Sequence, residues 1–492
     1  MGISWLLPGL LGLPWVGAAV VALWGERPRL RLRADHLACA FAAVSWLPLL
    51  LMLGQVKGSD TTLFRAPWIP TVGINLALRL DALSLPLVVN VLAVSLLALW
   101  YGLGYLRDKP RLHVCNALLL AFMGSMLGTL LADDALLFLV FWEGMLVASS
   151  LLIGGWGEGE NRGRITLKYF LYTQIGSLLL LVALARLVGL AGSSDLSVIA
   201  AKASELPREE VRWIAALMVI GFCVKLAVFP VHAWLPDAHS VAPMPVTVML
   251  AAAMLSMGAY GILRFPLVVL HGQGFEALQL PLMILALVSQ VYGALMALAS
   301  HDIKRIVAYS SVSQMGYVVF ALASLNPQGM GGAVFHVLSH GILKALLFMG
   351  VGLVMHATGR RQLEELGGLY RTMPGVMAGL SIGAIAIAGL PPFCGFHSEW
   401  LIFTGGIASR YPVLGYIEVL IPLLTAGYAV WFAIRLALGT SPKGILPHPD
   451  LPAMSWPFYV LVILALVVGI FPAPVYAWVM DAAALLLPGG GL

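Results

Sequence analysis

Long apolar segments follow one another along almost the whole chain, and polar residues are confined to the shorter stretches between them. Each segment approaches the roughly 20 apolar residues that a membrane-spanning helix requires. Fourteen such segments cover residues 3–24, 36–54, 83–105, 112–131, 134–155, 165–190, 212–230, 243–264, 279–299, 303–323, 331–356, 374–405, 411–438 and 455–480. This pattern predicts an all-α polytopic membrane protein with about fourteen transmembrane helices.

Prolines interrupt the seventh and twelfth segments, at Pro230 and Pro236 and at Pro391 and Pro392. A proline removes a backbone donor, so a break inside a bilayer requires protein or water around it. Matching interrupted helices in two halves of a chain are typical of an inverted repeat around a transport path; two ordinary proline kinks are the alternative. We expect N-terminal helices in 1–111, a first repeat (helices 4–8) in 112–264, a second (helices 9–13) in 279–438 and a C-terminal helix in 455–492.

The composition supports the membrane assignment. Hydrophobic residues make up 60% of the 492 positions and charged residues only 10%, against roughly 25% charged residues in a soluble domain. Mean hydropathy is +0.94. These values exclude a soluble enzyme and a receptor with a large soluble domain. The formal net charge of +5 comes from basic residues in short loops, which is not the footprint of a nucleic-acid-binding protein.

The distribution of lysine and arginine predicts the orientation. If the amino terminus lies outside, the inside loops contain seventeen basic residues, Lys304 among them, and the outside loops contain nine, Arg264 among them. Because positive residues accumulate on the cytoplasmic side, we expect both termini to lie outside the cytoplasmic membrane and the loop Arg27–Arg33 to lie inside.

No cofactor is expected within this chain. The four cysteines Cys39, Cys115, Cys223 and Cys394 are far apart and form no CxxC pair, so an iron–sulfur cluster, a zinc site or a disulfide framework is not predicted. The glycine-rich stretch 154–161, which precedes Arg162 and Arg164, lacks the strand and the Gly-Lys-Ser/Thr ending of a phosphate loop. It is interpreted as an inside loop.

Ionisable residues lie within several of the apolar segments. A charge at the bilayer centre costs several kcal/mol or more, so such residues usually mark a function, although a buried structural residue is the alternative for any one of them. The set comprises Glu143 in the fifth segment, Lys225 in the seventh, His336, His340 and Lys344 in the eleventh, and Glu399 after the break in the twelfth. The three residues of the eleventh segment are four apart and therefore share one helical face.

A line of such groups can conduct protons. Burial disfavours the charged forms of carboxyl and ammonium groups, and opposite charges close by do the reverse, so a buried Glu–Lys pair can exchange protons near neutral pH. Histidine titrates in that range already. With bridging water, these residues form a proton wire. His397, close to Glu399, is a further candidate for the line, whereas His232 and His356 lie near segment ends and are interpreted as interfacial.

Four stretches of the sequence resemble one family: Lys225–His239, Asp302–Gly316, Phe335–Phe348 and Gly389–Trp400. The family comprises the antiporter-like subunits of respiratory complex I, of membrane-bound hydrogenases and formate hydrogenlyases, and of Mrp-type sodium/proton antiporters. The phrase Gly395–Ile402 is most similar to hydrogenase-type members and to members like complex I subunit M.

The resemblance implies fourteen helices with helices seven and twelve broken. It also implies proton or sodium translocation driven by redox chemistry elsewhere in a large complex, with other membrane subunits and hydrophilic redox subunits as partners. Glu143 resembles the family's helix-five glutamate and Lys225 its helix-seven lysine partner. His336, His340 and Lys344 match the helix-eleven pattern, and Glu399 matches the terminal charge of helix twelve.

The sequence departs from the family pattern in helix eight. Ser256 occupies the position where many members have a lysine, and Ala251 lies near the alternative histidine position. Either water and Ser256 replace the missing charge, or this subunit does not pump by the full family route. A scaffold subunit that keeps the fold and no longer pumps is a further alternative. A stand-alone secondary transporter for a small molecule is a third possibility.

Overall fold

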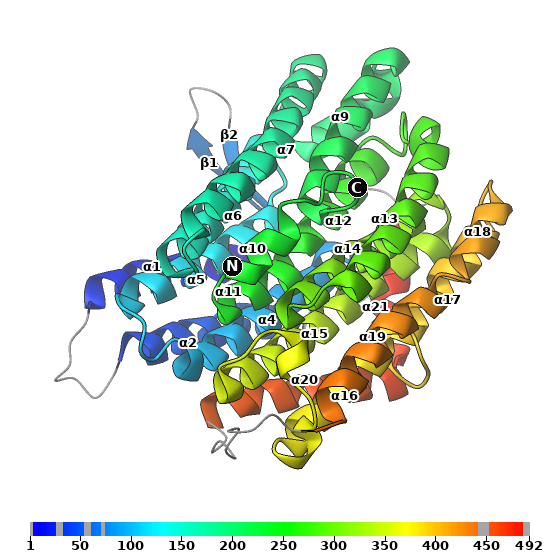
Figure 1. The fold of residues 1–492 in the computed structure, drawn as a ribbon. Helices are drawn as coiled ribbons and strands as arrows, with labels where there is room; N and C mark the ends of the chain where they lie inside the picture. The colour runs from blue at the N-terminus through cyan, green and yellow to red at the C-terminus, as the bar shows by residue number, and fades with distance from the viewer. Residues whose placement is uncertain (1–2, 26–32, 54–60, 70–73, 441–451, 486–492) are drawn as a thin grey trace.

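The computed structural model describes residues 3–25, 33–53, 61–69, 74–440 and 452–485, and its helices lie roughly alongside one another (Figure 1). The N-terminal part contains α1 (Leu6–Trp24), α2 (Ala34–Val44), α3 (Trp46–Leu53), β1 (Thr62–Ile69), β2 (Ile74–Leu80) and α4 (Ser84–Tyr105). The next part contains α5 (Leu112–Leu131), α6 (Ala135–Trp156), α7 (Arg162–Ala191), α8 (Leu196–Lys202), α9 (Arg208–Leu226), α10 (Leu235–Val241), α11 (Met244–Met249) and α12 (Leu255–Ile262). The last part contains α13 (Gln279–Ala299), α14 (Ile303–Ala323), α15 (Pro327–Thr358), α16 (Pro374–Ile387), α17 (Cys394–Ile407), α18 (Pro412–Glu418), α19 (Pro422–Ala437), α20 (Pro452–Ile470) and α21 (Ala473–Ala484).

Twelve helices in the described part of the chain are long and apolar enough to cross a membrane. They correspond to twelve of the fourteen predicted segments. The other two, 212–230 and 374–405, coincide with interrupted helices, so the count of fourteen stays a prediction. The predicted C-terminal segment 455–480 consists of two helices, because α20 ends at Ile470 and α21 begins after Pro472.

Both interruptions occur where the prolines predict them. α9 ends at Leu226 and helix resumes with α10 at Leu235, and α16 ends at Ile387 before α17 begins at Cys394. Each break contains a cis X–Pro peptide bond. Protein side chains bind the backbone beside both breaks: Trp234 Nε1 donates to the Val224 carbonyl at 2.9 Å, and Ser339 Oγ donates to the Cys394 carbonyl at 3.2 Å. The breaks therefore lie against protein, as irregular backbone in a membrane requires.

The helix-eight segment is irregular and buried. Short π-helical stretches at Leu250–Met254 and Leu263–Val269 flank α12. Asn90 of α4 donates to the Ala252 carbonyl at 2.8 Å. α15 packs against α14, α16, α17, α20 and α21 near the middle of the molecule (Figure 1).

A two-stranded antiparallel sheet lies where the sequence analysis expects only a loop. β1 and β2 pair from Thr62 opposite Leu80 to Ile69 opposite Ile74, with an irregularity between Pro67 and Ile69. The alternation of apolar and polar or small residues along Ile74–Leu80 is the signal that could have predicted this hairpin.

Asp81, between β2 and α4, forms a buried ion pair with Arg264. Two guanidinium nitrogens of Arg264 donate to the two carboxylate oxygens at 2.7 and 2.8 Å. Burial by itself would raise the pKa of Asp81, but Arg264, together with the amide of Ser84, outweighs burial and lowers this pKa to about 2. Arg264, which the sequence analysis counts as an outside-loop charge, is thus an internal residue that ties the helix-eight segment to the base of the hairpin.

Replacing Arg264 with methionine is expected to destabilise the protein by about 3–5 kcal/mol, because the Asp81 carboxylate is left buried without its partner. The double variant Arg264→Met/Asp81→Asn removes both charges and should lose less. Since the pKa of Asp81 lies below its ordinary value of 3.8, the carboxylate stabilises the fold fully above about pH 4, and this contribution is lost as pH falls toward 2. Thermal unfolding of the detergent-solubilised protein measures both effects. Equal losses in the single and double variants would contradict the pairing.

Candidate functional site

One face of α15 carries three buried ionisable residues, His336, His340 and Lys344. Their spacing of four residues brings successive side chains together, and the rings of His336 and His340 lie 6.5 Å apart between centroids. The Lys344 ammonium donates to the Val307 carbonyl at 3.0 Å and to the hydroxyl of Ser310, both on α14. Its acceptors are therefore neutral.

Glu399 lies beyond the histidine end of this face, on α17. His336 Nδ1 is 3.0 Å from the hydroxyl oxygen of Ser398, the residue that precedes Glu399. Glu399 is buried, and one of its carboxylate oxygens has no hydrogen-bond partner among the described residues. Its carboxylate rests against Gly389 in the break, where a Cβ atom would overlap the carboxylate. Gly389 also has a φ of +70°, so this position requires glycine for both reasons.

Glu418, the last residue of α18, is a second buried acid that the sequence analysis missed. Gln290 of α13 donates to it at 3.0 Å, and Glu399 acts on it electrostatically. The sequence pattern could have predicted this residue, because Glu418 is a single acid within an apolar segment, as Glu143 is.

Glu143 and Lys225 lie near each other on α6 and α9, but they do not form an ion pair within 4.0 Å. Lys225 is buried, and its ammonium lies 5.1 Å from the centroid of the Trp142 ring and lacks a hydrogen-bond partner among the described residues. Glu143 is half-buried and acts electrostatically on Lys225.

The expected bridging position on helix eight carries no charge. Ser256 is buried, and its hydroxyl donates to the Ala253 carbonyl of its own helix. The nearest basic residue along this helix, Arg264, is engaged by Asp81.

A second group of buried bases lies beside Lys344. His239 of α10 is buried, and neither of its ring nitrogens has a hydrogen-bond partner among the described residues. It interacts electrostatically with Lys304 and Lys344. Lys304, which the sequence analysis places in an inside loop, is fully buried and donates to the Ala242 carbonyl at 2.5 Å. Buried polar groups without protein partners usually bind water, so this region is suited to a hydrated connection.

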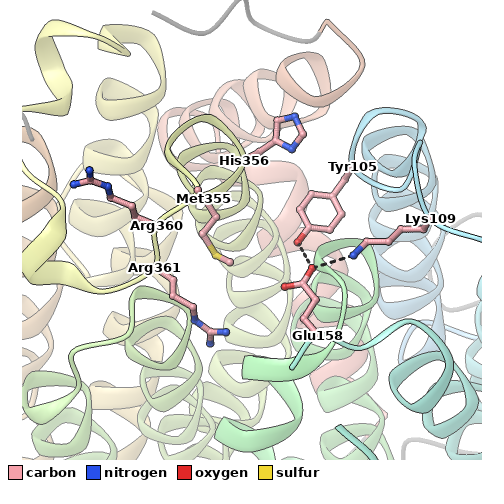
Figure 2. A pocket seen from close by; sticks show the side chains of 8 residues that line it. Tyr105, Lys109, Glu158, Met355, His356, Arg360 and Arg361 are labelled. Atoms are coloured by element: carbon pink, nitrogen blue, oxygen red, sulfur yellow. Dashed lines mark hydrogen bonds and ion pairs between the residues drawn. The ribbon is translucent and has the colours of Figure 1, made fainter. Parts of the chain in front are cut away.

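A polar pocket of about 400 Å³ lies at the C-terminal end of α15. Figure 2 shows Tyr105 and Lys109 directed toward Glu158, while the side chain of Arg360 points away from them. His356 and Arg361 also line the pocket. The Tyr105 hydroxyl donates to Glu158 at 3.1 Å, and the Lys109 ammonium lies 3.7 Å from the same oxygen. Glu158 acts electrostatically on Lys304, so the pocket is linked to the buried bases. His356 lines this pocket at the helix end.

His397 and His232 lie away from these groups. His397 Nε2 is 2.8 Å from the Gly469 carbonyl oxygen, and its ring packs against Phe335 and Tyr476. His232, which the sequence predicts to lie near the membrane interface, is buried and packs against Phe229 and Tyr292. Within the described ranges, no three His, Cys, Asp or Glu side chains come together as metal ligands would.

Comparison with known proteins gives the family. Residues 132–425 match the family described as "NADH:quinone oxidoreductase/Mrp antiporter, TM", and residues 68–114 match the N-terminal region of chain 5 of NADH-ubiquinone oxidoreductase (complex I). The chain is 33% identical over 429 residues to F420H2 dehydrogenase subunit M of Methanosarcina mazei, covering 83% of each chain. It is 32% identical over 492 residues to NADH-quinone oxidoreductase subunit M of Rhodobacter capsulatus, covering 95% of this chain and 93% of the relative.

A chain of respiratory complex I from Thermus thermophilus has the same fold, with a TM-score of 0.86, 27% identity, and coverage of 98% of this chain and 100% of that chain. The resemblance predicted from the four motifs, including its similarity to subunit M, is confirmed. The chain therefore belongs to the family of antiporter-like membrane subunits of complex I and Mrp antiporters.

Proposed function

We propose that this chain moves protons, or sodium ions, through the membrane as a non-redox subunit of a redox-driven respiratory complex. The observation that carries the proposal is the series of buried ionisable groups on α15 and α17. Lys344 lies beside two histidines, and the series continues through Ser398 to Glu399 and Glu418. Ionisable groups this deep in a membrane protein usually belong to an ion path.

His239 and Lys304 connect this series to one face of the protein. Glu158 in the pocket acts on Lys304, Lys304 on His239, and His239 on His340. We infer that ions enter the α15 face by this route. The absent charge at Ser256 then does not interrupt transport in the second half of the chain.

The remaining parts of the proposal follow from the sequence. The chain spans the cytoplasmic membrane with both termini outside; Arg27, Arg29 and Arg31, on which this orientation partly depends, lie outside the described residues. The two predicted repeats form the two halves of the path, and the redox cofactors belong to hydrophilic partner subunits. Labelling of a cysteine introduced at Arg164 from the cytoplasmic side tests the orientation, and labelling from the outside only would reverse it.

Replacing His239 with glutamine tests the route. Proteoliposomes containing the whole complex should show normal electron transfer but fewer ions taken up per electron, because glutamine cannot exchange a proton. His232→Gln is the matched control, since His232 belongs to the same break and packs against aromatic rings. It should leave the ratio unchanged.

The missing helix-eight charge favours one other function, a scaffold subunit that does not pump. In that case His239→Gln would leave ion uptake per electron unchanged, as the control does. Parallel measurements with proton-sensitive dye and with labelled sodium identify the ion.

A further inference from the structure

An apolar groove runs along the surface formed by α5, α6 and α7, apart from the buried ionisable groups. Its volume is about 680 Å³, within the range of roughly 300–1,000 Å³ typical of small-ligand sites. The lining is almost entirely apolar, with Leu118 on α5, Leu151 on α6 and Phe170 on α7 among its side chains. These helices are neighbours along the bundle (Figure 1).

Glycines make the surface concave at one end of the groove. A Cβ atom added at Gly155 or Gly163 would meet no atom within 4 Å, so both positions border open space. Val147, Leu151 and Leu167 line the groove and are each more than half exposed. Since these residues belong to membrane-spanning helices, the groove faces lipid or another membrane protein.

Positive charge gathers at the glycine end. Arg162 and Arg164 are exposed in the first turn of α7, where the unpaired backbone amides also favour an anion. Trp156 lines the groove at the same level, as interfacial tryptophans do. Two acids lie nearby in the sequence, and one of them, Glu158, already interacts with Tyr105 and Lys109. The local charge is therefore positive, with two arginines and one remaining acid, Glu160.

Two polar side chains line the groove, Thr166 and Ser150, and the Thr166 hydroxyl donates to the Arg162 carbonyl. Ser150 is 8% exposed, and its hydroxyl has no hydrogen-bond partner among the described residues although it lines the groove. It lies six residues before Trp156 on α6, which corresponds to about 9 Å along a helix. A buried hydroxyl without a partner is costly, so a ligand with an acceptor at this depth would stabilise it.

We propose that this groove binds an anionic phospholipid. The phosphate lies at Arg162 and Arg164, an ester carbonyl accepts a hydrogen bond from Ser150, and an acyl chain occupies the apolar floor. Basic clusters at the ends of membrane helices attract anionic headgroups, and a phospholipid supplies the anionic group and the long apolar chain in one molecule.

The test uses the whole complex in phosphatidylcholine vesicles that contain a small fraction of phosphatidylglycerol with a photoactivatable group on its acyl chain. Illumination should label peptides of α5–α7. Arg162→Gln and Arg164→Gln should each reduce the labelling roughly fivefold, since one basic residue near an anionic surface contributes about that factor. The same changes at Arg208 and Arg410 should have no effect on this labelling.

A second variant tests the groove itself, independently of the arginines, by filling it with a larger side chain. Gly155→Leu should also displace the probe, whereas Gly189→Leu, at an equally open glycine of α7 outside the groove, should not. Equal labelling of these peptides by a matching phosphatidylcholine probe would overturn the proposal, because the groove would then hold any bulk lipid. Absence of lipid labelling, with cross-links from the groove to another subunit, would show that a protein helix covers it.

Discussion

Lys225→Ala is expected to abolish ion uptake by the first half of the chain, or to stop electron transfer along with it. The ammonium is buried against the Trp142 ring without a hydrogen-bond partner among the described residues, and Glu143 is the acid that acts on it. Alanine removes the buried ammonium on which Glu143 acts, so the two residues can no longer work as a pair. The measurement is the number of ions taken up per electron by proteoliposomes containing the whole complex.

The effects of Lys225→Ala and Glu143→Gln should be far from additive. Residues that act as one unit lose most of their function when either is removed, so the double variant should be little worse than either single variant. Lys202→Ala is the control, because Lys202 lies apart from this pair and donates to the carbonyl of Ala191, the last residue of α7. A normal ratio of ions to electrons in either single variant would show that this pair is structural.

The helical architecture could be predicted from the sequence because its two causes are local. Runs of about 20 apolar residues define spanning helices, and prolines define where two of them break. The acids and bases that stand out in long apolar runs, such as Glu143 and Lys344, could be found in the same way. The structure places Lys344 with neutral partners on α14, which depends on how two neighbouring helices pack and leaves no signal in the sequence.

The apolar pattern does not show whether a charged residue near the end of a segment is buried or exposed. Lys304 and Arg264 each lie at an end of an apolar segment, so both are predicted to be loop charges, yet both are buried. Whether a terminal charge reaches water or turns inward depends on the neighbouring elements. Ala242 supplies an acceptor for Lys304, and Asp81 supplies one for Arg264. His239 lies within a recognised motif, but only its burial beside Lys304 and Lys344 marks it as part of a path.

Glu399→Gln is expected to leave assembly intact and to abolish, or strongly reduce, transport through this subunit. The amide keeps the shape of the side chain and therefore its fit against Gly389. It cannot take up or release a proton, so the series from Lys344 through His336 loses its last exchanging group before Glu418. Ion uptake by proteoliposomes, normalised to the amount of assembled complex, gives the result.

Glu399→Asp tests whether an exchangeable proton is sufficient at this position or whether the length of the side chain also matters. The shorter carboxylate retains an exchangeable proton but withdraws from the break, so it should keep part of the activity. Glu364→Gln is the control for the loss of a carboxylate, because Glu364 lies on the surface and pairs with His301. Full pumping by Glu399→Gln would mean that Glu399 is only a buried polar residue. The ion would then have to leave the α15 face by another group, and Glu418, which Gln290 holds within the electrostatic reach of Glu399, would be the residue to replace next.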